Sequence, residues 1–196
     1  MGGGEPPIIQ SHLPYNGHPV SVPAFSFPAM LYKRLLFEAK FCPPQSFASR
    51  VADLPRPLVF TNGCFDILHR GHVTYLSRAR ALGACLVVAL NSDDSVRKLG
   101  KGDDRPLNTL EDRMAVVASL ECVDLVTWFE EETPLSRIVE SRPDVLVKGG
   151  DWAIDAIIGA IEVRAWSGSV CSIPFEFERS TTSLIERIRS LRVDNG

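Results

Sequence analysis

Short apolar runs alternate along the chain with longer segments in which apolar residues recur every three or four positions. The runs are typical of strands covered on both faces, and the recurring positions are typical of helices with one buried face. The predicted strands span residues 58–61, 85–90, 123–129, 145–148 and 169–173, and the longer helices span 46–54, 69–82, 109–120, 133–141 and 153–166. This alternation predicts an α/β domain built on a five-stranded parallel sheet with right-handed crossovers.

The helix predicted over residues 69–82 has a defined inward face and a defined end. Its expected inward residues are Val73, Leu76 and Ala79. Gly83 stands where a left-handed residue commonly ends a helix. Further along, residues 153–166 predict one mostly helical segment, which Gly159 weakens.

The first forty residues differ in composition from the rest. Before Met30 the chain is rich in proline and glycine and holds a single charged residue, Glu5. Burial of so little apolar surface does not offset the entropy of ordering, so we expect residues 1–40 to form a disordered or poorly ordered extension and residues 41–196 to form the domain. Two alternatives stay open, a genuine tail and a true start at Met30. Residues 31–41 have the pattern of a short amphipathic helix suited to docking or to a dimer contact.

Composition and charge narrow the function classes. The chain has 196 residues, 45% of them hydrophobic, and a net charge of -3, and no apolar run approaches the length of a membrane span. A protein that binds nucleic acid usually has a concentrated basic face, which this balance does not provide. Five cysteines without a CxxC pair favour neither a zinc site nor a disulfide framework, so we expect a cytoplasmic protein without nucleic-acid or membrane partners.

The richest chemistry lies where the first predicted strand ends. Residues 61–66 read Thr-Asn-Gly-Cys-Phe-Asp, and His69, Gly71 and His72 follow at the start of the next helix. A glycine that lets backbone approach a ligand, helix-terminal N–H groups and two imidazoles one turn apart all suit phosphate. Cys64 lies inside this turn, and we hypothesise that bound nucleotide protects its thiol.

Polar residues also follow the other strands. They are Asn91 to Asp93, Lys148 to Asp151 and Ser180 to Thr182. In an open parallel sheet, ligands lie beyond the carboxyl ends of the strands, so we expect these groups to meet at one rim. Residues 97–106 are charged and broken by glycines, and they predict a mobile loop whose Lys98 and Lys101 clamp a triphosphate.

These motifs together carry a resemblance. His69-Arg70-Gly71-His72 fits the HxGH signature of the nucleotidyltransferase superfamily, and residues 61–66 fit the turn that precedes it in cytidylyltransferase-like members. With Val147 to Asp151 and Ser180 to Ile185, residues 41–192 closely resemble the adenylyltransferases that act on D-glycero-β-D-manno-heptose 1-phosphate in lipopolysaccharide core synthesis. The resemblance implies a Rossmann-like doubly wound sheet of strand order 3-2-1-4-5. It also implies transfer of AMP from ATP to the sugar phosphate, which yields ADP-heptose and pyrophosphate.

The resemblance assigns roles to individual residues. The expected catalytic residues are His69, His72, Lys98 and Lys101. The expected nucleotide-binding residues are Thr61, Asn62, Gly63, Cys64, Phe65, Gly71, Asn91, Asp93, Arg113, Ser180, Thr181 and Thr182. The expected acceptor-binding residues are Asp66, Lys148, Gly149 and Asp151. Mg²⁺ is expected to bind mainly through the ATP phosphates, with no ligand set assigned on the protein.

Other interpretations stay open from the residues alone. The nearest is a cytidylyltransferase for glycerol 3-phosphate or a similar small phosphate, and the choice of ATP over CTP depends on resemblance. A non-catalytic nucleotide-binding module is an alternative of another class, and a zinc site at the two histidines with Asp66 is a third. Ile161 adds apolar bulk where the family pattern suggests a smaller or polar residue. Glu130 to Glu132 are read as a solvated acidic surface.

The resemblance also suggests partners. The substrates are ATP and a sugar 1-phosphate, and the chain is expected to form a homo-oligomer, either a dimer or a tetramer. In many bacteria this domain is fused behind a heptose kinase of ribokinase-like fold, and the residues before position 41 are too few for one. A separate heptose kinase acting upstream, and a phosphatase, are therefore expected in the same cell.

Overall fold

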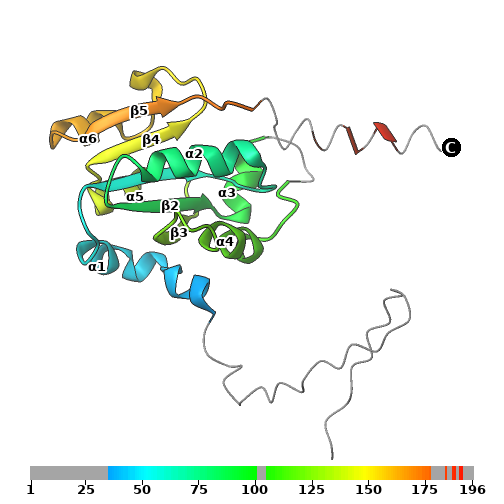
Figure 1. Cartoon of the computed structure of the whole chain (residues 1–196), viewed down its shortest axis with the longest axis horizontal. Helices are drawn as coiled ribbons and strands as arrows, with labels where there is room; N and C mark the ends of the chain where they lie inside the picture. The colour runs from blue at the N-terminus through cyan, green and yellow to red at the C-terminus, as the bar shows by residue number, and fades with distance from the viewer. Residues whose placement is uncertain (1–34, 101–104, 178–183, 185–186, 189, 192–196) are drawn as a thin grey trace, which may run out of the picture. The chain divides into compact units, whose positions relative to one another are not determined.

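A five-stranded parallel sheet organises the domain, as the alternating pattern predicts (Figure 1). Its strands are β1 (Leu58–Gly63), β2 (Cys85–Asn91), β3 (Leu125–Phe129), β4 (Val145–Gly149) and β5 (Ser169–Ile173). Their order in the sheet is β3-β2-β1-β4-β5, and all neighbours run parallel. Both the doubly wound class and the expected strand order are confirmed.

The computed structural model describes residues 35–100, 105–177, 184, 187–188 and 190–191. Its helices are η1 (Leu36–Lys40), η2 (Pro44–Ser46), α1 (Phe47–Ala52), α2 (Arg70–Arg80), α3 (Asp93–Lys98), α4 (Leu110–Ala118), α5 (Leu135–Ser141), η3 (Ile154–Ala156) and α6 (Ala160–Ala165). Lys101, Ser180, Thr181 and Thr182 lie outside the described residues. Near the end of the chain, the described residues Leu184, Arg187, Ile188, Ser190 and Leu191 are helical. None of the helices in the described part of the chain has the length and apolar character needed to cross a membrane.

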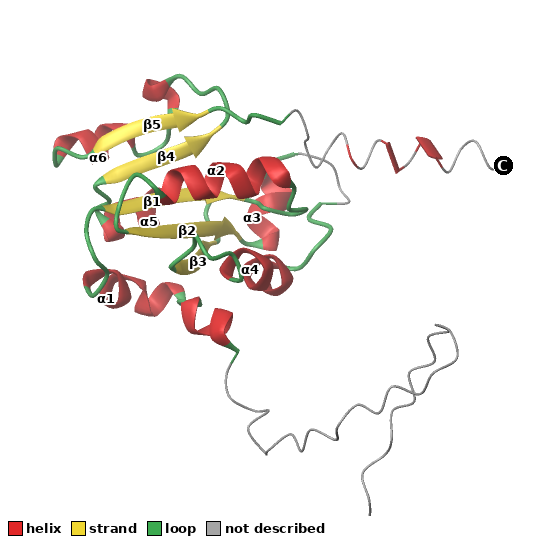
Figure 2. Ribbon diagram, viewed as in Figure 1, coloured by secondary structure: helices red, strands yellow, loops and turns green. Residues whose placement is uncertain are grey.

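Helices cover both faces of the sheet (Figure 2). Leu76 and Ala79 of α2 and Val117 of α4 pack with strand side chains such as Val88 in one buried cluster. On the other face, side chains from α1, α5 and α6 pack with the alternate strand residues. All seven residues of β2 are buried, which explains its continuous apolar run.

The inward face of α2 differs from the predicted one. Val73 is 41% exposed, whereas Tyr75 is buried beside Leu76. Gly83 is not left-handed. It is required for a different reason, because a Cβ there would lie 2.4 Å from the carbonyl oxygen of Pro57. The glycine thus marks a close backbone approach and not a helix cap.

The single helix predicted over residues 153–166 is wrong. The chain forms the short η3, then reaches Gly159 at a φ of +86°, and only then enters α6. A Cβ at Gly159 would lie 2.8 Å from Cδ1 of Ile138, so packing against α5 requires the glycine. Ile161, the residue that differs from the family pattern by its apolar bulk, is 78% exposed on α6.

The first residues of the charged segment that follows β2 are helical, where a loop was predicted. Lys98 lies in the last turn of α3, and the hydroxyl of Ser92 caps this helix by accepting from the N–H of Ser95 at 3.1 Å. Thr109 caps α4 in the same way, by accepting from the N–H of Asp112 at 3.3 Å. Lys98 is therefore placed by a helix and not by a free loop.

Residues before the first strand contribute to the fold. Phe41 forms a bridge with Val126 of the edge strand, and Phe37 packs against the core next to it. In place of the expected amphipathic helix, the described residues form the short η1, where Leu36 is 92% exposed. The domain boundary near residue 41 stays a prediction.

Candidate functional site

The site begins in the turn that follows β1. Phe65 adopts a φ of +49°, which is uncommon for a residue with a side chain, and its ring is buried. A Cβ at Gly63 would lie 3.0 Å from that ring, so the glycine lets the ring fold back onto the strand end. The sharp turn fixes the path of the chain into α2 and places the first of the site's side chains.

Two stacked histidines stand at the start of α2. His69 is the N-cap residue, and the ring centroids of His69 and His72 are 3.8 Å apart with an interplanar angle of 28°. Phe65 meets the His72 ring edge-on at 5.3 Å, and Phe175 meets it from after β5 at 6.1 Å. A Cβ at Gly71 would lie 3.0 Å from the His69 ring, so this position between the histidines leaves room for little more than glycine.

The surroundings keep both imidazoles neutral near pH 7. Burial lowers the pKa of His72 to about 4, and the proximity of His69 adds to the shift. Burial also lowers the pKa of His69. The Nδ1 atoms of both rings are buried, and neither has a hydrogen-bond partner in the described part of the chain. Buried polar atoms without partners are rare in proteins and are typical of sites that bind a polar ligand.

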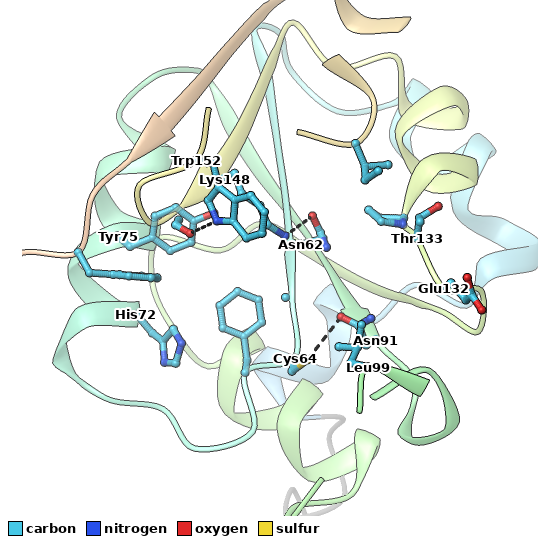
Figure 3. A pocket seen from close by; sticks show the side chains of 16 residues that line it. Asn62, Cys64, His72, Tyr75, Asn91, Leu99, Glu132, Thr133, Lys148 and Trp152 are labelled. Carbon is cyan, nitrogen blue, oxygen red and sulfur yellow. Dashed lines mark hydrogen bonds between the residues drawn. The ribbon is translucent and has the colours of Figure 1, made fainter. Parts of the chain in front are cut away.

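A pocket of about 430 Å³ opens beside these residues at the carboxyl ends of the strands (Figure 3). The turn after β1 contributes Asn62, Gly63, Cys64 and Phe65. Residues around α2, β4 and β5 contribute His72, Tyr75, Lys148, Gly149, Trp152 and Phe175. Residues after β2, β3 and η3 contribute Asn91, Leu99, Glu132, Thr133, Pro134 and Ile158. The predicted meeting of strand ends at one rim is therefore observed for Asn91, Lys148 and Gly149, whereas Ser180 to Thr182 lie outside the described residues.

The side of the pocket near β4 is cationic and aromatic. Nζ of Lys148 donates to Oδ1 of Asn62 at 3.2 Å and lies 5.8 Å from the centre of the Trp152 ring. The indole N–H of Trp152 donates to the carbonyl of Gly149 at 3.1 Å, which holds the ring at the edge of the pocket. Phe175 packs edge-on against Tyr75. The side chains that line this side are thus already oriented without a ligand.

Near β2, the polar side chains that line the pocket form hydrogen bonds with other protein groups. Asn91 is buried, and its amide donates to the hydroxyl of Ser95 at 2.9 Å. The thiol of Cys64 approaches Oδ1 of Asn91 at 3.7 Å. Cys64 therefore lies in the pocket wall, where the hypothesis of ligand protection places it, and that hypothesis stays a prediction.

Behind the turn lies a group of four charged side chains that does not line the pocket, buried except for the half-buried Asp93. We call it the Arg113 cluster, and it consists of Asp66, Asp93, Arg105 and Arg113. The carboxylate of Asp66 accepts from the N–H of Leu107 and of Asn108, each at 2.9 Å, and pairs with Nε of Arg105 at 2.8 Å. The side chain of Asp66 is 1% exposed and that of Arg105 is 10% exposed. Asp66 thus ties residues 105–108 to the turn.

Arg113 completes this cluster from α4. Its side chain is fully buried, and it donates to the carbonyl of Cys64 at 2.7 Å and to the carbonyl of Asn108 at 3.1 Å. It also pairs with Asp93 at the start of α3, at 2.6 Å. One guanidinium therefore joins the turn after β1 to two helices, and none of its donors lines the pocket that the described residues form.

The structure sorts the predicted site residues into groups. Those that line the pocket are Asn62, Gly63, Cys64, Phe65, His72, Asn91, Lys148 and Gly149. Those that support it from directly beside or beneath are Thr61, His69 and Gly71. Thr61 is buried and hydrogen bonds to the hydroxyl of Tyr75.

Other predicted residues lie away from the pocket. Asp66, Asp93 and Arg113 belong to the Arg113 cluster, and Asp151 is exposed and does not line the pocket. Lys98 lies near the carbonyl of Glu130, at 3.5 Å. The zinc alternative loses its third ligand, because Asp66 is engaged with Arg105 and backbone N–H groups. In the described part of the chain no three potential ligand side chains converge on a metal position.

Several pocket residues were not predicted. Tyr75, Trp152 and Phe175 form the aromatic side, and Glu132 and Thr133 form part of the opposite one. The rule that ligands lie at strand ends would have indicated Trp152, Phe175, Glu132 and Thr133, since each follows a predicted strand within four residues. The expected solvated acidic surface at Glu130 to Glu132 is confirmed in that all three residues are exposed, but it overlooks that Glu132 lines the pocket.

A doubly wound parallel sheet with a histidine pair beside its first strand end defines a nucleotidyltransferase domain. The sequence pattern of the cytidylyltransferase-like family matches residues 60–191, and the chain belongs to that family. It is similar to a D-beta-D-heptose 1-phosphate adenylyltransferase of Bordetella bronchiseptica, with 57% identity over 155 residues that cover 78% of this chain and 96% of the relative.

Further relatives extend the comparison. The chain is 52% identical over 136 residues to the bifunctional protein HldE of Hahella chejuensis, a match that covers 69% of this chain and 28% of HldE. Among solved structures, a lipopolysaccharide core biosynthesis protein from Thermoplasma volcanium aligns with a TM-score of 0.52 and 28% identity, over 62% of this chain and 98% of that protein. A pantoate-beta-alanine ligase from Francisella tularensis aligns with the same TM-score at 15% identity, over 72% of this chain and 68% of the ligase, and it shares the fold alone.

Proposed function

We propose that the chain is an adenylyltransferase that moves AMP from ATP to D-glycero-β-D-manno-heptose 1-phosphate and releases pyrophosphate. The geometric observation that supports this function most directly is the stacked, neutral histidine pair, whose buried Nδ1 atoms lack partners in the described residues and whose His72 lines the pocket. The Bordetella relative supports the choice of substrates, because its name gives that activity and the match spans 96% of its length.

The reaction requires positioning and charge neutralisation more than proton transfer. An oxygen of the acceptor phosphate, already ionised, forms a bond to the α-phosphorus of ATP, and the bond from that phosphorus to the pyrophosphate oxygen breaks. A neutral imidazole has one N–H, which His72 donates to a phosphate oxygen as negative charge builds there. His69 stacks behind it and fixes its ring plane. A preorganised donor of this kind typically contributes about 3 to 4 kcal/mol to lowering the barrier.

Lys148 is proposed to receive the acceptor phosphate. Its ammonium lies between Asn62 and Trp152, beside the end of β1, which supports a position next to the α-phosphate that the acceptor attacks. Gly149 lets the backbone after Lys148 lie against the Phe175 ring, since a Cβ there would lie 2.9 Å from that ring. Asp151 stays a candidate acceptor contact from the exposed side of the same turn. The triphosphate clamp by Lys98 and Lys101, and the contacts of Ser180 to Thr182, also stay proposals.

Mg²⁺ is proposed to enter with ATP. Among the described residues that line the pocket, the single carboxylate is that of Glu132, so the protein offers few ligands and the triphosphate oxygens hold the ion. When bound, the ion neutralises charge on the phosphates. The protein's own share is then to place the triphosphate against the histidine pair.

The cellular setting follows the proposed reaction. We infer a homo-oligomer, supported by the exposed leucines at positions 35 and 36. All five cysteines are free, which fits a reducing cytoplasm. A heptose kinase acting upstream and a phosphatase would supply the acceptor.

Pyrophosphate release tests the proposal against its alternatives. The assay compares ATP with CTP as donor and heptose 1-phosphate with glycerol 3-phosphate as acceptor. We expect turnover with ATP and heptose 1-phosphate to exceed every other combination. Faster turnover with CTP and glycerol 3-phosphate would identify a cytidylyltransferase, and nucleotide binding without turnover in any combination would identify a non-catalytic module.

A further inference from the structure

The pocket has two chemically different sides. Around β4 and β5 it offers aromatic rings and the ammonium of Lys148, and after β3 it offers the carboxylate of Glu132 and the hydroxyl of Thr133. Figure 3 shows His72, Tyr75 and Trp152 on one side and Asn91, Glu132 and Thr133 on the other. Flat aromatic faces suit a purine base, whereas carboxylates and hydroxyls suit groups that donate and accept hydrogen bonds.

Of the three consecutive glutamates after β3, only the third lines this pocket. The carboxylate of Glu131 accepts from the N–H of Glu130 at 2.9 Å and from the hydroxyl of Ser136 at 3.0 Å, so it belongs to the start of α5. Glu130 does not line this pocket, and its carbonyl accepts from Nζ of Lys98 at 3.5 Å. Within the described part of the chain, the carboxylate of Glu132 has no hydrogen-bond or ion-pair partner.

A carboxylate at the edge of a pocket for two anionic substrates repels their phosphates. It is an acceptor without donors, so it binds uncharged O–H and N–H groups, and a sugar ring presents several such hydroxyls. Its position therefore marks the part of the pocket that receives the hydroxylated end of a substrate. We propose that Glu132 and Thr133 form a subsite that binds the ring hydroxyls of the acceptor sugar, an assignment that rests on the proposed adenylyl transfer.

The position of the subsite in the sheet fits a sugar and not a shorter acceptor. Glu132 follows β3, which lies two strands from β1 in the sheet order. Neighbouring strands are about 4.8 Å apart, so the ends of β1 and β3 are separated by roughly 10 Å. An acceptor whose phosphate lies near the turn after β1 must extend by about one sugar ring to reach Glu132.

Two further groups support this subsite. The amide oxygen of Asn62 accepts from Lys148, and its two amide hydrogens have no acceptor among the described residues, so they remain available as donors between the phosphate and Glu132. Thr133 precedes the buried Pro134, whose carbonyl accepts from the N–H of Ile138 at 3.0 Å. The subsite is thus attached to the start of α5 before any ligand binds, which lowers the entropy lost on binding.

Steady-state kinetics of three near-isosteric variants of the full chain test the assignment. Glu132→Gln and Thr133→Val each remove one polar function from the subsite, and Glu130→Gln removes the same charge two residues away from it. We expect Glu132→Gln to raise the KM for heptose 1-phosphate about tenfold, because one charge-assisted hydrogen bond is lost. Thr133→Val should raise this KM several-fold, whereas the KM for ATP stays within about twofold in both variants, and Glu130→Gln behaves as the wild type.

Four results would overturn the assignment. An unchanged KM for heptose 1-phosphate in both pocket variants would exclude sugar recognition here. A raised KM for ATP with normal acceptor affinity would assign Glu132 to the ribose of the nucleotide, and a raised Mg²⁺ requirement would assign it to the metal. A wild-type enzyme that never turns over heptose 1-phosphate would instead reject the proposed function itself, and the acceptor subsite with it. Thermal unfolding of each variant controls for a general loss of structure.

Discussion

The pocket and the Arg113 cluster both contain residues from one short stretch of chain, residues 61–72, yet their polar groups differ in whether they have partners within the protein. In the pocket, the Nδ1 atom of His72 is buried without a partner in the described residues, and Lys148 is drawn to the rim beside Trp152. In the cluster, Asp66 and Arg113 each meet several protein groups. The polar groups of the pocket can therefore still bind a ligand, whereas those of the Arg113 cluster are already bound to other protein groups and stabilise the fold.

This difference shows that a motif residue is not a ligand contact by virtue of its position in the motif. Cys64 and Phe65 of the turn line the pocket, whereas Asp66, the next residue, points behind it to Arg105. The turn needs both kinds of residue, because an accurately placed pocket wall requires a rigid support. The comparison makes separate predictions for the two regions.

The largest effect is expected from removal of the buried guanidinium. Arg113→Met leaves Asp93 and two carbonyls without their donor, so we expect the free energy of unfolding to fall by about 3 to 5 kcal/mol. Urea denaturation measures this change. Arg97→Met is the matched control, since Arg97 pairs with Asp94 on the surface and its removal should change stability by less than about 1 kcal/mol. Equal losses in the two variants would contradict a structural role for the cluster.

The next effect concerns the pocket and should leave stability nearly unchanged. His72→Ala removes the side chain that is proposed to donate a hydrogen bond to a phosphate oxygen. We therefore expect turnover to fall at least about a hundredfold, which is equivalent to about 2.7 kcal/mol of barrier. Pyrophosphate release under saturating ATP measures it, and circular dichroism verifies the fold. Val73→Ala alters the adjacent but exposed position, and it should keep normal turnover. If turnover in His72→Ala stays near that of the wild type, the role assigned to His72 is wrong.

The smallest effect is a pH dependence of stability. The pKa of His72 is lowered from 6.5 to about 4, so between these values the unfolded chain binds a proton that the folded chain does not. Stability from this group is present above pH 6.5 and is lost as the pH falls toward 4. At pH 5 the wild type should have lost about 1 to 2 kcal/mol more than His72→Gln, relative to pH 7. Urea titrations at both pH values measure the difference, and parallel losses would show that the imidazole titrates normally.

Sequence alone predicts the sheet well because burial on both faces leaves a continuous apolar run. The limits of β2 and β5 are reproduced within a residue, and the family resemblance supplies the strand order. The break at Gly159 could not be predicted, since it depends on contact with Ile138 of another helix. Likewise, nothing in the local sequence places Gly83 against the backbone of Pro57.

The candidate site divides in the same way. The turn, the histidine pair and Lys148 could be predicted because strand ends and helix starts are visible as sequence patterns. The placement of Arg113 could not, because its partner Cys64 is 49 residues away in sequence. Glu132 was missed because a run of acidic residues reads as solvated surface, and only the positions of its neighbours distinguish the third glutamate from the first two.

The most direct test of the account is a crystal structure of the protein with a non-hydrolysable ATP analogue and Mg²⁺. The account predicts an α- or β-phosphate oxygen within about 3.2 Å of a His72 ring nitrogen, with the triphosphate beside the turn after β1. If the analogue binds elsewhere, while His72 keeps contact with only His69, Phe65 and Phe175, the proposed role of the histidine pair is contradicted.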